Sequence, residues 1–397
     1  HGVAVGRSYS FIVSAVNNQG ESLPSEPSTP ITLTAQKLHP LVAELKPGEI
    51  CTIAGNGKKG YSGDGNLAVN SSLNEPYDVA VDELGNIYIA DSGNNRIRKV
   101  SVEDMTIDTE VGTGVKGFSG DGINPRDAQL DRPRGIDFDN LGNLYIADRG
   151  NQRVHKVDSG SQTIETVAGN GKAGHSGDGQ PASSAELDNP ESVSVDRATG
   201  RVYITGWCSI GHKRVRMVDG TGTIHTFAGA EKGVKPEQGG LATRVEFKNL
   251  DDLVIAAGSG ETVYIGEQNS ARLYMVSDSG IMTTIAGNGE KFGDPDTNEG
   301  TEAPMSPQGL AFYAGDKTIF INDGGSSFAG NKLIRKFDID SGNVVTVAGA
   351  GKSGFEGDGG PATSARFRKP RGLAVDSYGN LYIADTDNQR VRVIRSP

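Results

Sequence analysis

Six polar residues, each one position after a recurrent proline or its equivalent, are the residues best placed to do chemistry. They are Tyr77, Arg134, Glu191, Asp251, Gln308 and Arg371. Carboxylates such as Glu191 and Asp251 can bind a metal ion or transfer protons, whereas arginine and glutamine can hold a polar or anionic ligand. The charges partly alternate in sign, so the same set also fits a water-filled channel whose polar groups pair with one another. The residue types alone favour that structural interpretation over a binding site.

Two kinds of acidic loop raise the question of calcium. Glycines flank one aspartate in each of four similar turns, at Asp64, Asp121, Asp178 and Asp358. Calcium needs several oxygens from one loop, so these turns favour an aspartate that accepts N–H bonds within its own turn. A richer loop, GDPDTNEG, begins at Gly293 and resembles the first half of an EF-hand with Asp294, Asp296 and Asn298. It lacks the glycine and the final glutamate that complete such a loop, so calcium there is a hypothesis only.

The positions of the histidines do not favour a catalytic zinc site. A catalytic zinc needs three protein ligands. None of the six histidines falls on a strand predicted to line the channel. Carboxylates and amides around Glu191 and Asp251 leave open a metal-dependent hydrolase or lyase. Trp207 is expected on an exposed loop, where an aromatic side chain can anchor a partner.

These residues belong to a unit that recurs six times. A Thr-x-Ala-Gly phrase, or a close relative, ends in the glycines Gly55, Gly112, Gly169, Gly229, Gly287 and Gly349. Between these marks a second phrase reads PYDVAVDELGNIYIADSGNNRIRKV from Pro76, with close copies from Pro133 and Pro370. Weaker copies begin at Pro190, Leu250 and Pro307. Each copy alternates apolar and polar residues between Gly/Asn/Asp turns, which is typical of four short antiparallel strands.

Six such units predict an all-β, six-bladed β-propeller over residues 50–397. The last copy ends at Ile394 with three strands, and a spare strand precedes the first copy at residues 50–55. We expect this N-terminal strand to complete the sixth blade, which removes an exposed edge. Residues 37–49 are expected to form a linker.

Strand alternation sorts the loops onto two faces. Loops of about 20 residues, such as 56–75, run from a fourth strand to the next first strand and are expected beside the turns between second and third strands. We call this side the long-loop face. Loops of this length are usually functional or disordered. We therefore expect ligands at the channel mouth on the long-loop face, rather than on the opposite short-turn face, where turns such as DELGN lie.

The repeated phrase resembles the NHL repeat, and the loops GNGKKGYSGDG and GAGKSGFEGDG resemble the variant found in large secreted or surface proteins. The first, second and sixth copies match closely, while the third to fifth depart from the pattern. Residues 1–36 resemble the last strands of a fibronectin type III domain, through the Tyr9 phrase, the turn at 17–20 and the proline-rich run from Ser22 to Pro30. These resemblances imply an extracellular protein, secreted or at the cell surface.

Composition narrows the function. The 397 residues carry a formal charge of −11, which argues against a nucleic-acid partner or an anionic membrane surface. No stretch of 18 apolar residues could span a membrane. We predict a non-catalytic binding or structural scaffold that contacts a protein partner, further copies of itself or a carbohydrate through the long-loop face. No cofactor is expected beyond the calcium candidate.

Overall fold

The computed structural model describes residues 36–206, 213–235, 240–247, 250–255, 262–291, 296–297, 299–324 and 331–396. Of Asp251 and residues 253–255 it describes the backbone alone. Before residue 36 it describes only the backbone of four short strands, which pair β1 with β4 and β2 with β3. They are β1 (Ser8–Tyr9), β2 (Val16–Asn17), β3 (Gly20–Glu21) and β4 (Ile31–Thr32). The fibronectin resemblance therefore lies largely outside the described residues.

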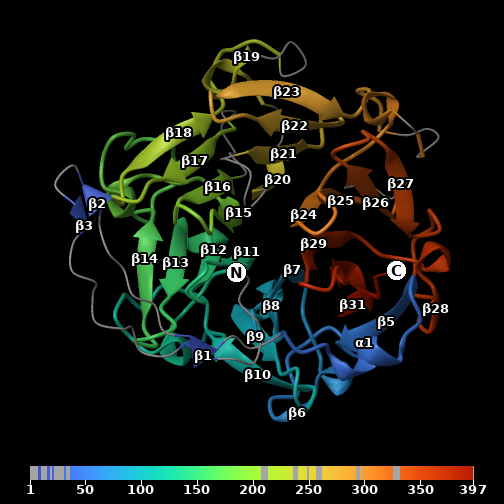
Figure 1. The fold of residues 1–397 in the computed structure, drawn as a ribbon. Helices are drawn as coiled ribbons and strands as arrows, with labels where there is room; N and C mark the ends of the chain where they lie inside the picture. Colours follow the sequence, from blue (N-terminus) through green and yellow to red (C-terminus); the bar gives the residue numbers. More distant parts are fainter. Residues whose placement is uncertain are drawn as a thin grey trace.

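Six antiparallel sheets of four main strands each surround a central axis (Figure 1). Blade 1 holds β7 (Pro76–Val81), β8 (Ile87–Asp91), β9 (Arg96–Val100) and β10 (Thr106–Val111). Blade 2 holds β11 (Pro133–Phe138), β12 (Leu144–Asp148), β13 (Arg153–Val157) and β14 (Ile164–Ala168). Blade 3 holds β15 (Pro190–Val195), β16 (Val202–Gly206), β17 (Val215–Val218) and β18 (Ile224–Ala228).

The second half repeats this plan. Blade 4 holds β20 (Leu250–Ile255), β21 (Val263–Glu267), β22 (Arg272–Val276) and β23 (Ile281–Ala286). Blade 5 holds β24 (Gly309–Tyr313), β25 (Thr318–Asp323), β26 (Leu333–Asp338) and β27 (Val344–Ala348). Blade 6 holds β29 (Pro370–Val375), β30 (Leu381–Asp385), β31 (Arg390–Ile394) and β5 (Glu49–Ala54), and β5 pairs with β31. The predicted all-β, six-bladed propeller is confirmed.

The long loops add short elements at the outer edges. Three two-residue strands extend blades 1, 4 and 6, namely β6 (Asn66–Leu67), β19 (Gly240–Leu241) and β28 (Gly360–Pro361). Single 3-10 turns lie in the long loops at 68–70, 125–127, 182–184, 242–244, 300–302 and 362–364. Others follow the second strands at 92–94, 149–151 and 386–388. The long loops thus cover sheet edges that would otherwise expose unpaired backbone groups.

The recurrent glycine after each fourth strand has a steric reason. Gly55 has a φ of +89°, and a Cβ atom there would collide with the carbonyl oxygen of Gln389 in the neighbouring strand turn. Gly112 repeats this arrangement against Asn95. Only glycine fits a left-handed backbone in such close contact with another chain segment, so the motif recurs with the fold.

The hydrophobic core lies between adjacent blades. The buried side chains of Tyr88 and Phe138, from blades 1 and 2, stack edge to face with ring centroids 4.8 Å apart. Ala80 and Ile97 of blade 1 join the same cluster as Ile136 of blade 2. Each blade therefore depends on its neighbours for burial, as expected for a repeat architecture.

The segment 37–49, expected to be a linker, contains a short helix, α1 (Pro40–Glu44). It lies beside β5 in Figure 1, and Val42 is fully buried in the cluster shared by blades 1 and 6. Proline at the first helical position suits a helix start, because its missing N–H has no partner there anyway. Among the described residues, no helix is long and apolar enough to cross a membrane.

His39, just before α1, should make the protein sensitive to mild acid. Its ring is fully buried, neither ring nitrogen has a hydrogen-bond partner among the described residues, and burial lowers its pKa from 6.5 to about 4. Because the unfolded chain binds this proton below pH 6.5 and the folded chain does not, stability falls as pH drops from 6.5 towards 4. We expect wild type to lose about 2 kcal/mol more between pH 7.5 and 5 than a His39→Leu variant.

Urea unfolding of both proteins at the two pH values measures this difference. Parallel losses in wild type and His39→Leu would show that the histidine is not the source of the acid sensitivity.

Candidate functional site

Three residues from the first strands of blades 1–3 meet at the long-loop end of the channel. The Tyr77 hydroxyl donates a hydrogen bond of 3.1 Å to Oε2 of Glu191. Nη1 of Arg134 contacts the same Glu191 oxygen and lies 3.1 Å from the Tyr77 hydroxyl. Nε of Arg149 donates to the other carboxylate oxygen of Glu191, Oε1, at 2.9 Å. Both oxygens of Glu191 are therefore engaged by cations.

The charges around Glu191 determine its ionisation. Burial would raise its pKa, but Arg134 and Arg149 outweigh burial, and the pKa lies below its usual value. At neutral pH Glu191 is thus a carboxylate held in two ion pairs. This environment stabilises a clamp between blades 2 and 3, and it suits neither a proton donor nor a metal ligand with a free oxygen.

The other sequence candidates fall around this clamp or outside the described residues. Arg371 lies over the Tyr77 ring at 5.5 Å from its centroid, and Arg134 lies over the same ring at 4.2 Å. Gln308 is buried in blade 5. The side chain of Asp251 and all of Trp207 are outside the described residues.

Arg149 was not anticipated from sequence. It follows the last residue of β12, where the close copies have Ser92 and Thr386. The sequence signal for Arg149 was its charge, because the close copies have a small hydroxyl residue at the same position.

A large cavity opens at the opposite end of the channel from the one expected. It has a volume of about 810 Å³ and reaches the turns between first and second strands, including Asp82, Arg197 and Tyr378. The reason is side-chain size. Tyr77, Arg134 and Glu191 are large and narrow the long-loop end on the side of blades 1–3, whereas the next position of each first strand is small in four blades, at Gly135, Ser192, Gly309 and Gly372.

Three aspartates in this cavity join neighbouring blades. Asp78, Asp137 and Asp252 each accept a backbone N–H from the next blade, at 2.9 Å from Ile136, 2.8 Å from Val195 and 2.8 Å from Leu310. Burial, together with the charges of Asp252 and Asp137, raises the pKa of Asp78 well above its usual value. Their hydrogen bonds identify them as inter-blade connections along the channel wall.

The aspartates of the glycine-rich turns bond to a distant strand, so the predicted bond within their own turn is wrong. Asp121 accepts the backbone N–H of Thr166 at 2.9 Å, and Asp64 accepts that of Thr109 at 3.3 Å. Asp296, one of the calcium candidates, does the same with Thr346 at 2.7 Å. Each long loop crosses the outer edge of the next blade, and this brings the aspartate to its fourth strand. Asp294 and Asn298 lie outside the described residues.

Within the part of the chain that the structure describes, no group of three or more histidine, cysteine, aspartate and glutamate side chains could hold a metal ion.

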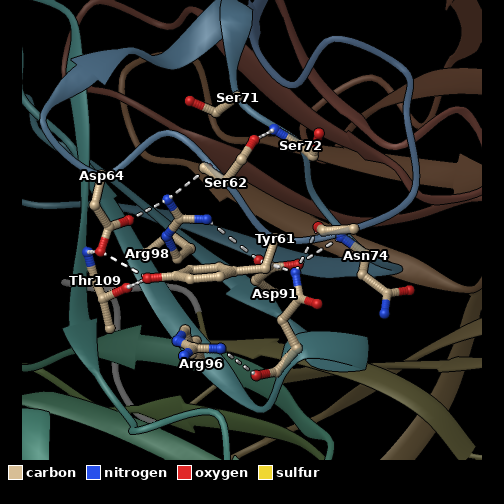
Figure 2. Close-up of polar contacts among 12 residues, drawn as sticks. Tyr61, Ser62, Asp64, Ser71, Ser72, Asn74, Asp91, Arg96, Arg98 and Thr109 are labelled. Carbon is tan, nitrogen blue, oxygen red and sulfur yellow. Dashed lines mark hydrogen bonds and ion pairs between the residues drawn. The ribbon is translucent and has the colours of Figure 1, made fainter.

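Figure 2 shows how one long loop is fastened to blade 1. Arg98 is fully buried and donates to Asp64 at 2.5 Å and to Asp91 at 3.5 Å. The Tyr61 ring lies between the guanidinium groups of Arg98 and Arg96, 4.9 and 3.7 Å from its centroid. The buried partner of Asp91 is Arg98, which lies two residues beyond Arg96 along β9.

The same arrangement recurs in blades 2 and 6. Phe118 lies under Arg153 at 3.9 Å and stacks on His155, and Phe355 lies under Arg390 at 3.7 Å. We call Tyr61, Phe118 and Phe355 the loop aromatics. Their exposed fractions are 43%, 38% and 37%, so each ring is held by the blade on one side and reaches solvent on the other.

Known proteins share this fold and repeat. The family model of the NHL repeat matches residues 73–100, 130–157 and 367–394, in the three copies that resemble it most closely. The chain is 28% identical to Protein SUPPRESSOR OF QUENCHING 1, chloroplastic, of Arabidopsis thaliana, over 82% of this chain and 30% of that protein. It is 26% identical to NHL repeat-containing protein 2 of Gallus gallus, over 82% of this chain and 47% of the relative. The chain thus spans less than half the length of these relatives.

Two solved structures have the same architecture at low identity. An auxiliary nutrient binding protein from Bacteroides ovatus aligns with a TM-score of 0.60 and 17% identity, over 96% of this chain and 82% of that one. A gluconolactonase from Xanthomonas campestris aligns with a TM-score of 0.55 and 14% identity, over 91% of this chain and 94% of that one. At this identity the likeness concerns the fold alone. The chain is a six-bladed β-propeller that carries NHL repeats in blades 1, 2 and 6.

Proposed function

We propose that this propeller is a non-catalytic binding module that works outside the cell and holds a protein partner on its long-loop face. The loop aromatics carry the proposal. Aromatic and arginine side chains are enriched at the energetic centres of protein interfaces. Here each ring is already fixed against an arginine, so binding would cost little conformational entropy.

The alternative is a metal-dependent hydrolase or lyase with a channel-mouth site near Glu191 and Asp251. The gluconolactonase fold supports it only by analogy. Against it stands the environment of Glu191, whose two oxygens are engaged by Arg134 and Arg149. A general acid needs a raised pKa, and that of Glu191 is lowered.

A pair of matched variants tests the binding function. Phe118→Ala/Phe355→Ala removes two loop aromatics that make no side-chain hydrogen bonds. Leu84→Ala/Leu141→Ala removes two exposed side chains, 52% and 72% accessible, from the short-turn face. Immobilised wild type and both variants would be exposed to extracellular fluid of the source organism, and retained proteins quantified by mass spectrometry. We expect the phenylalanine variant alone to lose a defined partner, and equal retention by all three would overturn the proposal.

Self-association is measured first, by light scattering after size exclusion across a dilution series. A concentration-dependent mass that the phenylalanine variant abolishes would identify the partner as a further copy of the chain.

Two further points concern the N-terminal side. We propose that β5 closes the ring, and that residues 1–36 are part of a fibronectin-type module. The second point supports the extracellular placement. Antibody labelling of intact and permeabilised source cells tests that placement, because a signal that requires permeabilisation would contradict it.

A further inference from the structure

We propose that the long-loop mouth of the channel binds a carboxylate group, held by Arg371 and the side-chain amide of Gln308 beside Lys332. The inference rests on the proposed use of the long-loop face for binding and names the chemistry that this face recognises.

Arg371 carries a charge that no described acid neutralises directly. No ion pair joins its guanidinium group to a carboxylate of the described residues, and its Nε is buried without a hydrogen-bond partner there. Its one described side-chain contact is with the ring of Tyr77. The neighbouring Arg134 shares that ring but is paired with Glu191. A cation in this setting gains from an anionic partner.

Gln308 presents an unused amide at the same place. Its exposed fraction is 6%, and neither Nε2 nor Oε1 has a hydrogen-bond partner among the described residues. It occupies the position in its blade that Tyr77, Arg134 and Glu191 occupy in theirs. Leaving a buried polar group without a partner is costly, so an unpaired amide calls for an explanation such as a missing ligand.

The backbone places Gln308 next to Arg371. The N–H of Gln308 donates to the carbonyl oxygen of Asn322 at 2.9 Å. The Asn322 side chain in turn donates to the carbonyl oxygen of Arg371 at 2.8 Å. A Cβ atom on Gly309 would touch that same carbonyl group. The two side chains therefore start from adjacent backbone segments of blades 5 and 6.

Lys332 adds a second cation, and this one is buried. Its exposed fraction is 5%, and Nζ donates to the carbonyl oxygen of Gly324 at 2.9 Å. Burial and the positive charge of Arg371 lower its pKa, and Asp387 offsets this only in part. The buried Lys332 and the half-buried Arg371 repel each other and create a local positive potential in a chain whose net charge is −11.

These donors match a carboxylate. A guanidinium group offers parallel N–H donors for two oxygens, and an amide NH2 group supplies a further donor. The carboxylate could come from a free organic acid or from a glutamate of a protein partner. The chemistry is the same, and the experiment separates the two sources.

The test uses two probes with one carboxylate chemistry. Binding of succinate, and of a hexapeptide with blocked ends and one central glutamate, would be measured by isothermal titration calorimetry. Wild type is compared with Arg371→Gln, with Gln308→Leu and with Arg368→Gln, which removes an exposed arginine from the loop just before β29. We expect at least one probe to bind wild type and Arg368→Gln alike, and to bind the other two variants about tenfold more weakly.

Gln308→Leu separates a ligand site from a structural role. Removing an unpaired buried amide should raise the unfolding midpoint of the free protein while it weakens carboxylate binding. A lowered midpoint would show that the amide has a structural partner and would overturn its assignment. Equal affinity of Arg371→Gln and wild type, or no binding of either probe, would overturn the site.

The outcome is independent of the proposed partner function. If a partner depends on Phe118 and Phe355 but neither probe binds, the carboxylate site fails and the binding module stands. If succinate binds through Arg371 but no partner depends on the loop aromatics, the site stands and the proposed function fails.

Discussion

A chain shortened to residues 56–397 is expected to lose cooperative folding, whereas one shortened to 36–397 keeps it. The shorter chain lacks β5, which pairs with β31 from Ile50 to Ala54. Ile50 packs in the cluster shared by blades 5 and 6, and Ile53 in the cluster shared by blades 6 and 1. Each buried isoleucine contributes about 1.5–3 kcal/mol. Together with the lost strand pairing, this approaches the 5–15 kcal/mol typical of a whole domain.

Urea unfolding followed by far-UV circular dichroism measures the effect. A permuted chain that carries residues 46–55 after residue 396, through a flexible linker, should restore the transition because the strand regains the same neighbours. A fragment 56–397 that unfolds at the same midpoint as 36–397 would show that β5 does not close the ring.

Repetition made the fold predictable. Six copies of one strand pattern defined six blades, since the glycine of each Thr-x-Ala-Gly phrase marks the same tight contact between strands. Repetition also identified the residues of the channel mouth. Tyr77, Arg134 and Glu191 hold equal positions in consecutive copies, and equal positions in a ring converge on its axis.

Contacts between copies were harder to derive. The aspartate of a long loop belongs to one copy and bonds to the fourth strand of the next, so Asp64 meets Thr109 rather than its own turn. Asp91 pairs with Arg98 rather than with Arg96 because of the direction in which each side chain leaves β9 and how deeply it is buried. The position of the cavity depends on side-chain volume at each level of the channel. Neither these contacts nor the position of the cavity can be derived from the spacing of residues within one copy.

The second large effect is expected at the buried ion pair of blade 1. Asp91→Ala should lower the free energy of unfolding by about 3 kcal/mol, because it leaves the buried Arg98 with the partly exposed Asp64 as its remaining acidic partner among the described residues. Both Asp91 and Arg98 are fully buried. Asp91 also accepts the Asn74 N–H and the side-chain amide of Asn94, each at 2.7 Å, and these donors lose their partner too. Burial outweighs these bonds and raises the pKa of Asp91 to about 6, so the carboxylate is charged at pH 8, where unfolding would be measured.

The Arg98→Met substitution tests whether the incompletely paired charge of Arg98 causes the loss of stability. Methionine keeps much of the volume of arginine without the charge. In the Asp91→Ala background it should therefore recover stability, although in wild type it would be destabilising. Such a reversal of sign is the coupling that a double-mutant cycle measures. Additive losses would instead assign the effect of Asp91→Ala to its hydrogen bonds with Asn74 and Asn94.

Blade 2 supplies a matched control within the same molecule. Asp148 occupies the position of Asp91, and it accepts the Asp131 N–H at 2.8 Å and the Asn151 amide at 2.6 Å. Its partner on the third strand is His155, at 3.2 Å, in place of an arginine. An imidazole has a neutral form, whereas a guanidinium group always carries its charge. Asp148→Ala should therefore cost clearly less than Asp91→Ala at pH 8. Equal losses at the two positions would mean that the repeated aspartate stabilises the blade through its turn bonds alone.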